Sequence, residues 1–201
     1  LEANLTLHTL TLTSGLLYLL VSPLISYVTF LNVLQLISMI LSAIGMILLV
    51  NYLAKPADYY ERLGSVAAGI IFAFSPYLFS HLTVGHYNLT MLWPIPLIVY
   101  FFYRTIRENK VTYAIWLGVL GSALGYLDTQ LLFFCGIILF IILIGELIFN
   151  INYFKKLITI YKLLLALILF GLLFMIPYGV LMKQAWAIKV GYGTLNNADF
   201  K

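Results

Sequence analysis

The chain has 201 residues, of which 63% are hydrophobic and 9% charged, and its formal net charge is +4. A chain with so few charged residues lacks the polar surface that covers a soluble globule, so a soluble domain is excluded and an integral membrane protein is indicated. The positive charge is concentrated in short loops between apolar runs, which is a pattern of membrane topology, and we expect no nucleic-acid partner.

The apolar runs are long and rich in Leu, Ile and Phe, which favours membrane-spanning helices over the short alternating strands of a membrane barrel. The first run, residues 15–27, is short and interrupted by Pro23, as in a helix that lies on the membrane surface. We interpret residues 1–30 as the remnant of a first outer loop with this juxtamembrane helix. The chain begins without methionine, and we expect it to be a piece of a longer protein.

Residues 31–182 are predicted to form an all-α, polytopic transmembrane bundle of about six spans. The predicted spans cover residues 31–54, 63–79, 89–103, 112–127, 131–149 and 157–181. The Ser75-Pro76 step is expected to kink the second span, because proline removes a backbone donor. Residues 183–201 are predicted to form an outer-face tail that leads to missing sequence.

Glycines mark where neighbouring helices are expected to approach closely. Gly118, Gly121 and Gly125 are spaced three and four residues apart, so they share one face of a helix. Gly45 is a further expected contact point, and Gly64, Ala67, Ala68 and Gly69 form a second expected small-residue face. Small residues at such positions let helix backbones pack tightly in a membrane.

The loop charges predict how the chain is oriented in the cytoplasmic membrane. Of the 11 Lys and Arg residues, eight belong to one alternating set of loops: Lys55, Arg62, Arg104, Arg107, Lys110, Lys155, Lys156 and Lys162. This set is predicted to face the cytoplasm. The segments 1–13, 80–88 and 128–130 hold no Lys or Arg, so they are predicted to face outside. An odd number of spans must then separate residues 1–13 from Lys55. Residues 15–27 and 31–54 therefore cannot both cross the membrane, and we expect the run interrupted by Pro23 to lie on the membrane surface.

The stretch FSPYLFSHLTVGHYNLTMLWPIP, residues 74–96, carries two of the three histidines. His81 and His86 are five residues apart and do not share a helix face, but a turn at Gly85 would let them converge. Three interpretations stay open: the imidazoles cap helix ends, they bind a phosphate or substrate together with Asn88, or they bind a divalent metal, with His86 as the metal candidate. Backbone donors at the start of the next helix would favour an anion.

Three buried or junctional side chains admit structural interpretations. Asp128 lies between two apolar runs, where an acid is a functional candidate and here a weak catalytic one, but it is equally suited to cap the next helix through the N–H groups of Gln130 and Leu131. Glu146 is expected to snorkel or to pair with a loop lysine. Cys135 is expected to be a small buried hydrophobe.

The order of these features resembles a known family. The segments LHTLTLTSGLLYLL (7–20), FLNVLQLISMILSAIGMILLVNYL (30–53) and AAGIIFAFSPYLFSHLTVGHYNLTMLWPIPLI (67–98) are similar to the GT-C-like glycosyltransferases, polytopic membrane proteins of bacteria and archaea. The similarity covers residues 1–143, and its most specific part is the FSPY, H, GH, N, W and P series. It implies that a sugar moves from a polyprenyl-phosphate donor to an acceptor on the outer face, often with a divalent metal.

The resemblance also implies roles for individual residues. The catalytic acid of the family sits in the first outer loop, upstream of these residues, and Glu2, the only acid in the remnant, is not expected to be the base. His81 and His86 would contact phosphate or metal, Asn88 would orient the substrate, and Asp128 would be a weaker partner. An apolar cleft beside the glycine-rich helices would hold the isoprenoid tail.

A second function stays open beside the transferase. The chain would then be a non-catalytic structural or accessory subunit of a larger membrane complex, surrounded by membrane lipid and by partner membrane subunits. The polar residues of the outer loops would cap helices and contact a partner. A transporter is disfavoured because the sequence shows no repeated halves with broken, charged helices.

Overall fold

The computed structural model describes residues 17–154, 156–180 and 183. This part of the chain is helical and contains no strand. Its elements are α2 (Tyr27–Ala54), α3 (Tyr59–Ala73), α4 (Pro76–Thr83), η2 (Tyr87–Thr90), α5 (Pro94–Arg107), α6 (Val111–Leu127), α7 (Thr129–Phe149), η3 (Ile151–Tyr153), α8 (Leu157–Phe170) and η4 (Gly171–Met175). The predictions for residues 1–16, which include Glu2, and for the tail beyond Lys183 lie outside the described residues.

Four helical segments are long and apolar enough to cross a membrane: Tyr27–Ala54, Tyr59–Thr83, Thr129–Phe149 and Leu157–Val180. They coincide with four of the predicted spans, and the chain is therefore a helical membrane protein. The other two predicted spans form α5 and α6, with 14 and 17 residues. At a rise of 1.5 Å per residue these helices reach roughly 21 and 26 Å, less than the ~30 Å hydrocarbon core.

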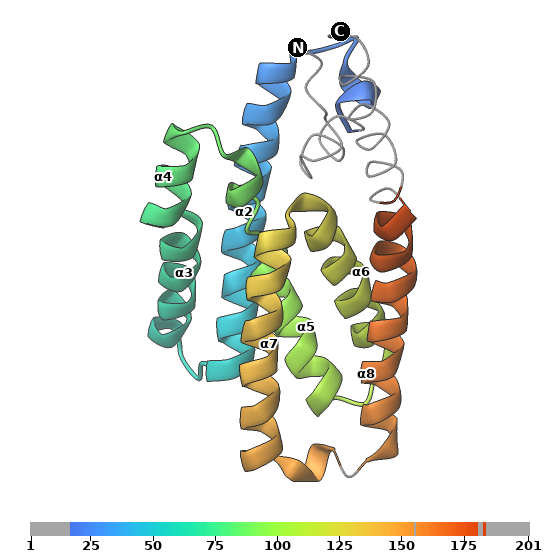
Figure 1. Ribbon diagram of the computed structural model, residues 1–201. Helices are drawn as coiled ribbons and strands as arrows, with labels where there is room; N and C mark the ends of the chain where they lie inside the picture. The colour runs from blue at the N-terminus through green and yellow to red at the C-terminus, as the bar shows by residue number, and fades with distance from the viewer. Residues whose placement is uncertain (1–16, 155, 181–182, 184–201) are drawn as a thin grey trace, which may run out of the picture.

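The second spanning segment is broken where proline predicted it. The helix α3 ends at Ala73, Ser75 has an extended backbone, and α4 begins at Pro76. Proline suits the first position of a helix, because the N–H group that it lacks would have no helical partner there. The break leaves α4 as a separate short helix beyond α3 (Figure 1).

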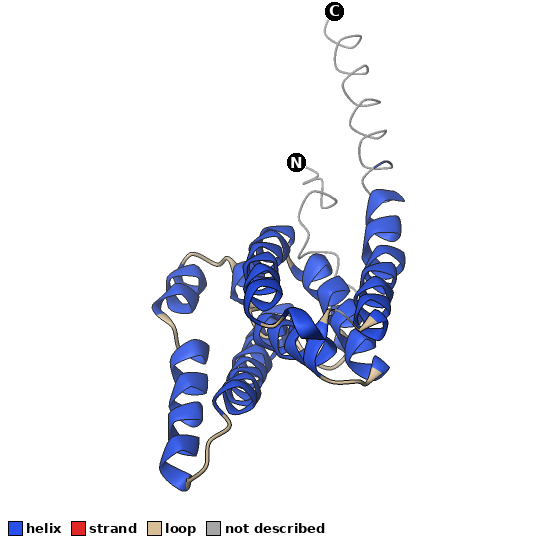
Figure 2. Ribbon diagram, turned by 90° about the horizontal axis from the view of Figure 1, so that it is seen from below, coloured by secondary structure: helices blue, strands red, loops and turns tan. Residues whose placement is uncertain are grey.

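The bundle is arranged around α5, which contacts α2, α6, α7 and α8. Figures 1 and 2 show α3 and α4 at one edge beside α2, and α8 at the opposite edge beside α6. The predicted glycine face of α6 is confirmed as the contact with α8 and η4. A Cβ atom on Gly118 would lie 2.8 Å from the Ala166 carbonyl oxygen, and one on Gly125 would lie 2.6 Å from the Phe174 ring.

A π-helical turn, η4, interrupts the last spanning segment where it meets α6. In η4 the regular i to i−4 hydrogen bonds of an α-helix are replaced, which changes the carbonyls available to other donors. The hydroxyl of Tyr126 donates to the Leu173 carbonyl at 2.7 Å, and the Phe174 ring packs against Gly125. The end of α6 is thus joined to η4 through one hydrogen bond and one ring contact.

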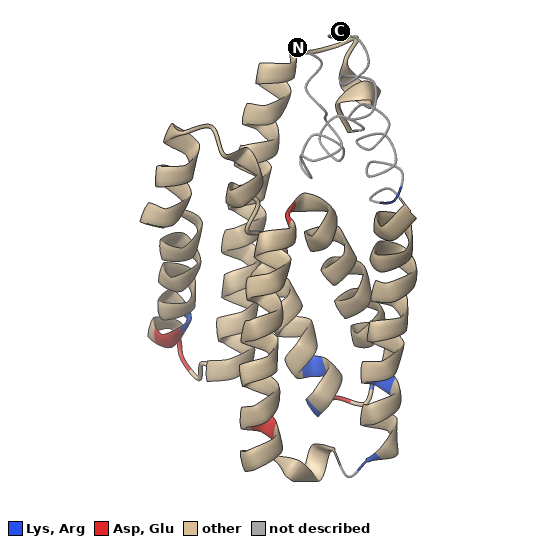
Figure 3. Ribbon diagram, viewed as in Figure 1, with Lys and Arg blue, Asp and Glu red and all other residues tan. Residues whose placement is uncertain are grey.

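Charged positions of α3, α5 and α8 gather at one end of the bundle (Figure 3). The turn between α6 and α7, which carries Asp128, lies at the other end of α7. This arrangement agrees with the alternation of basic and neutral loops in the sequence. The basic-end cluster, defined as Arg104, Arg107, Glu108, Glu146 and Lys162, connects α5, α7 and α8 there.

Two arginines of α5 organise the basic-end cluster. The guanidinium of Arg104 forms a two-pronged ion pair with Glu108, with Nε–Oε1 and Nη2–Oε2 distances of 2.7 and 2.9 Å, and lies 4.0 Å from the Tyr113 ring centroid. Arg107 pairs with the buried Glu146 of α7. Glu146 was predicted to snorkel or to pair with a lysine of a loop; its partner is instead an arginine of α5, because α5 and α7 are in contact.

The ion pair of Glu108 predicts an acid-sensitive contribution to stability. The hydrogen bonds from Arg104 lower the pKa of the Glu108 carboxyl below its ordinary value of 4.5. A lowered pKa in the folded state stabilises the fold above the unfolded value, and that stability is lost as the pH falls through the folded value. We expect thermal unfolding in nanodiscs to show a loss of about 1 kcal/mol or less on acidification that Glu108→Gln lacks. An identical pH dependence in Glu108→Gln would contradict this assignment.

Candidate functional site

His81, in α4, and His86, which precedes η2, lie side by side, as expected for a turn at Gly85. The Nδ1 atoms of His81 and His86 lie 3.4 Å apart, and the backbone N–H of His86 donates to the His81 carbonyl at 2.9 Å. Gly85 has a φ of 76°, a conformation that glycine adopts without strain. The ring of Tyr77 lies 4.5 Å from that of His81, between centroids. The histidine pair is therefore held by both its backbone and a neighbouring ring.

Asp128 caps α7, as one of its two interpretations predicted. Its Oδ1 accepts from the backbone N–H groups of Gln130 at 2.7 Å and Leu131 at 2.9 Å. Its Oδ2 accepts from the side-chain amide of Asn88 at 2.7 Å. Asp128 is only 3% exposed, and both of its oxygens are engaged with protein donors. In this arrangement the carboxylate is a structural partner that orients Asn88.

The residues that anchor η2 were not among those predicted from the sequence. Thr90 is fully buried, and its hydroxyl lies 2.6 Å from Gln35 Oε1 on α2 and 2.7 Å from the Tyr87 carbonyl. The Ser38 hydroxyl donates to the Thr90 carbonyl at 3.4 Å. The sequence did contain a signal for this contact: Gln35 and Ser38 stand three residues apart in an otherwise apolar span. Polar residues in such a span face the protein interior. This contact fixes the chain that follows His86 and Asn88 onto α2.

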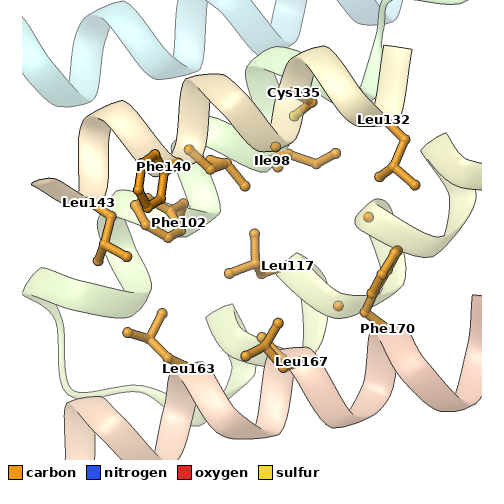
Figure 4. Close-up of a pocket in the computed structure, with 15 residues that line it drawn as sticks. Ile98, Phe102, Leu117, Leu132, Cys135, Phe140, Leu143, Leu163, Leu167 and Phe170 are labelled. Atoms are coloured by element: carbon orange, nitrogen blue, oxygen red, sulfur yellow. The ribbon is translucent and has the colours of Figure 1, made fainter. Parts of the chain in front are cut away.

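An apolar cavity of about 380 Å³ lies between α5, α6, α7 and α8. Figure 4 shows its walls converging from all four helices. The lining residues are Ile98, Phe102, Leu117, Gly118, Gly121, Leu132, Cys135, Gly136, Leu139, Phe140, Leu143, Leu163, Ala166, Leu167 and Phe170. The cavity includes two of the glycines beside which an apolar cleft was expected, and it contains the buried Cys135.

Leu132 is the residue of the cavity wall nearest in the chain to Asp128, while His81, His86, Asn88 and Asp128 do not line the cavity. Leu132 lines the cavity, and its backbone N–H donates to the Asp128 carbonyl at 3.1 Å, one helical turn away. Leu143, also on α7, lines the far end. Eleven residues separate the two leucines, which corresponds to roughly 16 Å along the helix. The part of α7 that lines the cavity is therefore about half as long as the membrane is thick, and it begins one helical turn after Asp128.

The polar residues near α4 and η2 fit one class of metal better than another. Within the described residues no group of three or more His, Cys, Asp and Glu side chains is arranged to hold a metal ion. Mg²⁺ prefers oxygen ligands, and the Asp128 oxygens are already engaged. Two imidazole nitrogens suit ions such as Zn²⁺, which bind histidine readily. His81 and His86 therefore fit as two ligands of a transition metal.

The structure does not bring every candidate residue together. Glu146 lies in the last turns of α7, at the opposite end of this helix from Asp128. His81, His86 and Asn88 belong to one continuous segment, and Asp128 joins them through Asn88.

Comparison with protein-family models, with curated proteins and with solved structures yields no match for this chain.

Proposed function

We propose that this chain is part of a membrane glycosyltransferase that binds a polyprenyl-phosphate sugar donor. In this proposal His81, His86 and Asn88 contact the phosphate, and the α5–α8 cavity receives the isoprenoid chain. The observation that supports it best is the order of residues on α7: Leu132 lines the cavity one helical turn after Asp128, whose carboxylate holds Asn88. A ligand with a polar head and a long apolar chain would place its head at the polar residues and its chain in the cavity.

The polar groups of the site have unused hydrogen-bonding capacity toward such a head group. The Asn88 amide donates to Asp128 with one of its two protons, which leaves the second proton and the amide oxygen for a ligand. Each imidazole keeps its Nε2 atom, and His86 is exposed. These groups would bind and orient phosphate and sugar oxygens. The base that activates the acceptor would come from the expected upstream acid.

The orientation in the membrane is part of the proposal. The basic-end cluster and the charged ends of α3 and α8 would face the cytoplasm, because positively charged loops are retained on that side. Residues 80–88 would then face outside the cytoplasmic membrane. Sugar transfer would take place at that surface, with the lipid tail of the donor lying between α7 and α8.

A cavity-filling variant tests the proposal. Gly136 lines the cavity, and a Cβ added to it would meet no atom of another element within 4 Å, so Gly136→Phe is expected to fill the cavity without a backbone clash. Gly145 on the same helix also has open space but does not line the cavity, so Gly145→Phe is the matched control. In nanodiscs, photo-crosslinking of a diazirine-labelled polyprenyl phosphate should fall at least tenfold in Gly136→Phe and stay unchanged in Gly145→Phe.

Sugar transfer by the full-length protein provides the second measurement. His86→Ala should raise the KM for the donor and lower turnover, while the photo-crosslink to the cavity persists. Equal crosslinking of the wild-type protein and Gly136→Phe would contradict the proposal that the cavity binds the isoprenoid chain. Unchanged turnover in His86→Ala would remove the imidazole from it.

An accessory role is the alternative, and one observation favours it. Both oxygens of Asp128 are used within the protein, since Asp128 caps α7 and holds Asn88, which is a structural role that needs no ligand. A full-length protein that crosslinks no polyprenyl phosphate and copurifies with a second membrane protein in fixed stoichiometry would support this role.

A further inference from the structure

The spacing of the histidine pair suggests more than a hydrogen bond. The two Nδ1 atoms are 3.4 Å apart, beyond the usual 2.7–3.2 Å of a hydrogen bond with a nitrogen donor. Zinc lies about 2.0–2.1 Å from an imidazole nitrogen, and two ligands at tetrahedral angles are then roughly 3.3–3.4 Å apart. The distance between the nitrogens thus equals one edge of a zinc coordination tetrahedron.

The pair is arranged before any ion arrives. His81 is carried by α4 and its ring contacts Tyr77, while His86 is fixed by its backbone bond to the His81 carbonyl. The carbonyl of His86 also accepts from the Leu89 N–H at 3.1 Å, which ties it to η2. Little rearrangement is therefore needed to place two nitrogens around one ion, and preorganisation of this kind raises affinity.

We propose that His81 and His86 form a two-nitrogen site for a Zn²⁺-class ion, bound through both Nδ1 atoms. His86 is exposed, so the remaining coordination positions are open to water or to an oxygen of a ligand such as phosphate. The charged positions of α3, α5 and α8 gather at the other end of the bundle, so their cations do not oppose the ion. The metal site requires no bound lipid, and it extends the proposed function by supplying a cation for the donor phosphate.

Metal binding by the purified full-length protein tests this site without any activity assay. In nanodiscs we expect one Zn²⁺ per chain by calorimetry, and a visible absorption spectrum when Co²⁺ replaces it. His81→Ala and His86→Ala should each weaken Zn²⁺ binding at least tenfold. His8→Ala, which removes the third histidine of this sequence, should change it less than twofold. Mg²⁺ in a large excess should not displace the bound ion, because it prefers oxygen ligands.

The stability of the protein gives an independent measurement. Zn²⁺ should raise the unfolding temperature of the wild-type chain and leave that of the His81→Ala/His86→Ala double variant unchanged, since an ion stabilises only a state that binds it. Zinc binding that survives in the double variant, or that is lost in His8→Ala, would overturn the site. Photo-crosslinking of polyprenyl phosphate in the presence of a chelator separates the two proposals: crosslinking without zinc binding refutes only the metal site, and zinc binding without crosslinking refutes only the lipid proposal.

Discussion

Gly118→Leu is expected to destabilise the bundle by about 3 kcal/mol or more, because overpacking a close helix contact forces backbone shifts. A Cβ on Gly118 already meets the Ala166 carbonyl oxygen and the Leu169 Cβ, each at 2.8 Å. The first is a backbone atom of α8 and the second is bonded to that backbone, so neither can rotate away. Even Gly118→Ala should therefore separate α6 from α8, which also widens the cavity that Gly118 lines.

Substitutions at two other glycines should cost less stability than those at Gly118. At Gly125 the obstacle is the Phe174 ring, which is a side chain that can turn, so Gly125→Ala should cost less than Gly118→Ala. At Gly64 on α3 an added methyl group would have no neighbour within 4 Å, so Gly64→Ala should be neutral or stabilise by about 0.5–1 kcal/mol through helix propensity. Denaturant unfolding followed by tryptophan fluorescence would rank the three. Equal effects of Gly118→Ala and Gly64→Ala would disprove the close contact.

Asp128→Ala is expected to be the second most damaging change, at roughly 2–4 kcal/mol. Loss of a helix N-cap costs about 1 kcal/mol, and loss of a hydrogen bond to a charged group costs about 1.5–3 kcal/mol. Asp128 supplies both, through Gln130 and Leu131 on one oxygen and Asn88 on the other. The start of α7 and the position of η2 should loosen together.

A double-mutant cycle separates the two contributions. Asn88→Ala removes only the tie to η2, so it should cost less than Asp128→Ala. The double variant should be about 1–3 kcal/mol more stable than the sum of the two losses predicts, because contacting residues do not act additively. Thermal unfolding in nanodiscs measures the cycle. Strict additivity would mean that the Asn88–Asp128 bond contributes nothing, and that Asp128 acts as a cap alone.

Several features of this site could be predicted from short stretches of the sequence. Asp128 precedes Gln130 and Leu131 at the spacing of a helix cap, and Gly85 stands between two histidines where a turn brings them together. Each of these predictions concerns residues at most five apart in the chain. Backbone geometry over such short distances follows from local sequence, which is why the structure confirmed them.

Other features depend on contacts that no local pattern encodes. The Asn88–Asp128 bond joins residues 40 apart, and the Thr90–Gln35 contact joins residues 55 apart. The Glu146 partner was expected among the loop lysines and proved to be Arg107, since a loop lysine and a helix arginine are equally plausible until the crossing of α5 and α7 is known.

By itself, the sequence determined that the chain is a helical membrane protein and where most of its helices begin and end to within a few residues. It also indicated the close helix contacts at Gly45, Gly69, Gly118 and Gly125, but the contact expected at Gly64 was wrong, because an added methyl group would meet no atom there. Hydrophobic run length, proline and glycine act locally, so their effects need no knowledge of the fold. Only the tertiary structure decided that α5 and α6 are shorter than the four spanning segments, and that an apolar cavity is lined by α7 from one turn after Asp128. The reason is that α7 is apolar around nearly its whole circumference, so its sequence does not indicate which face packs against protein and which faces a cavity or lipid.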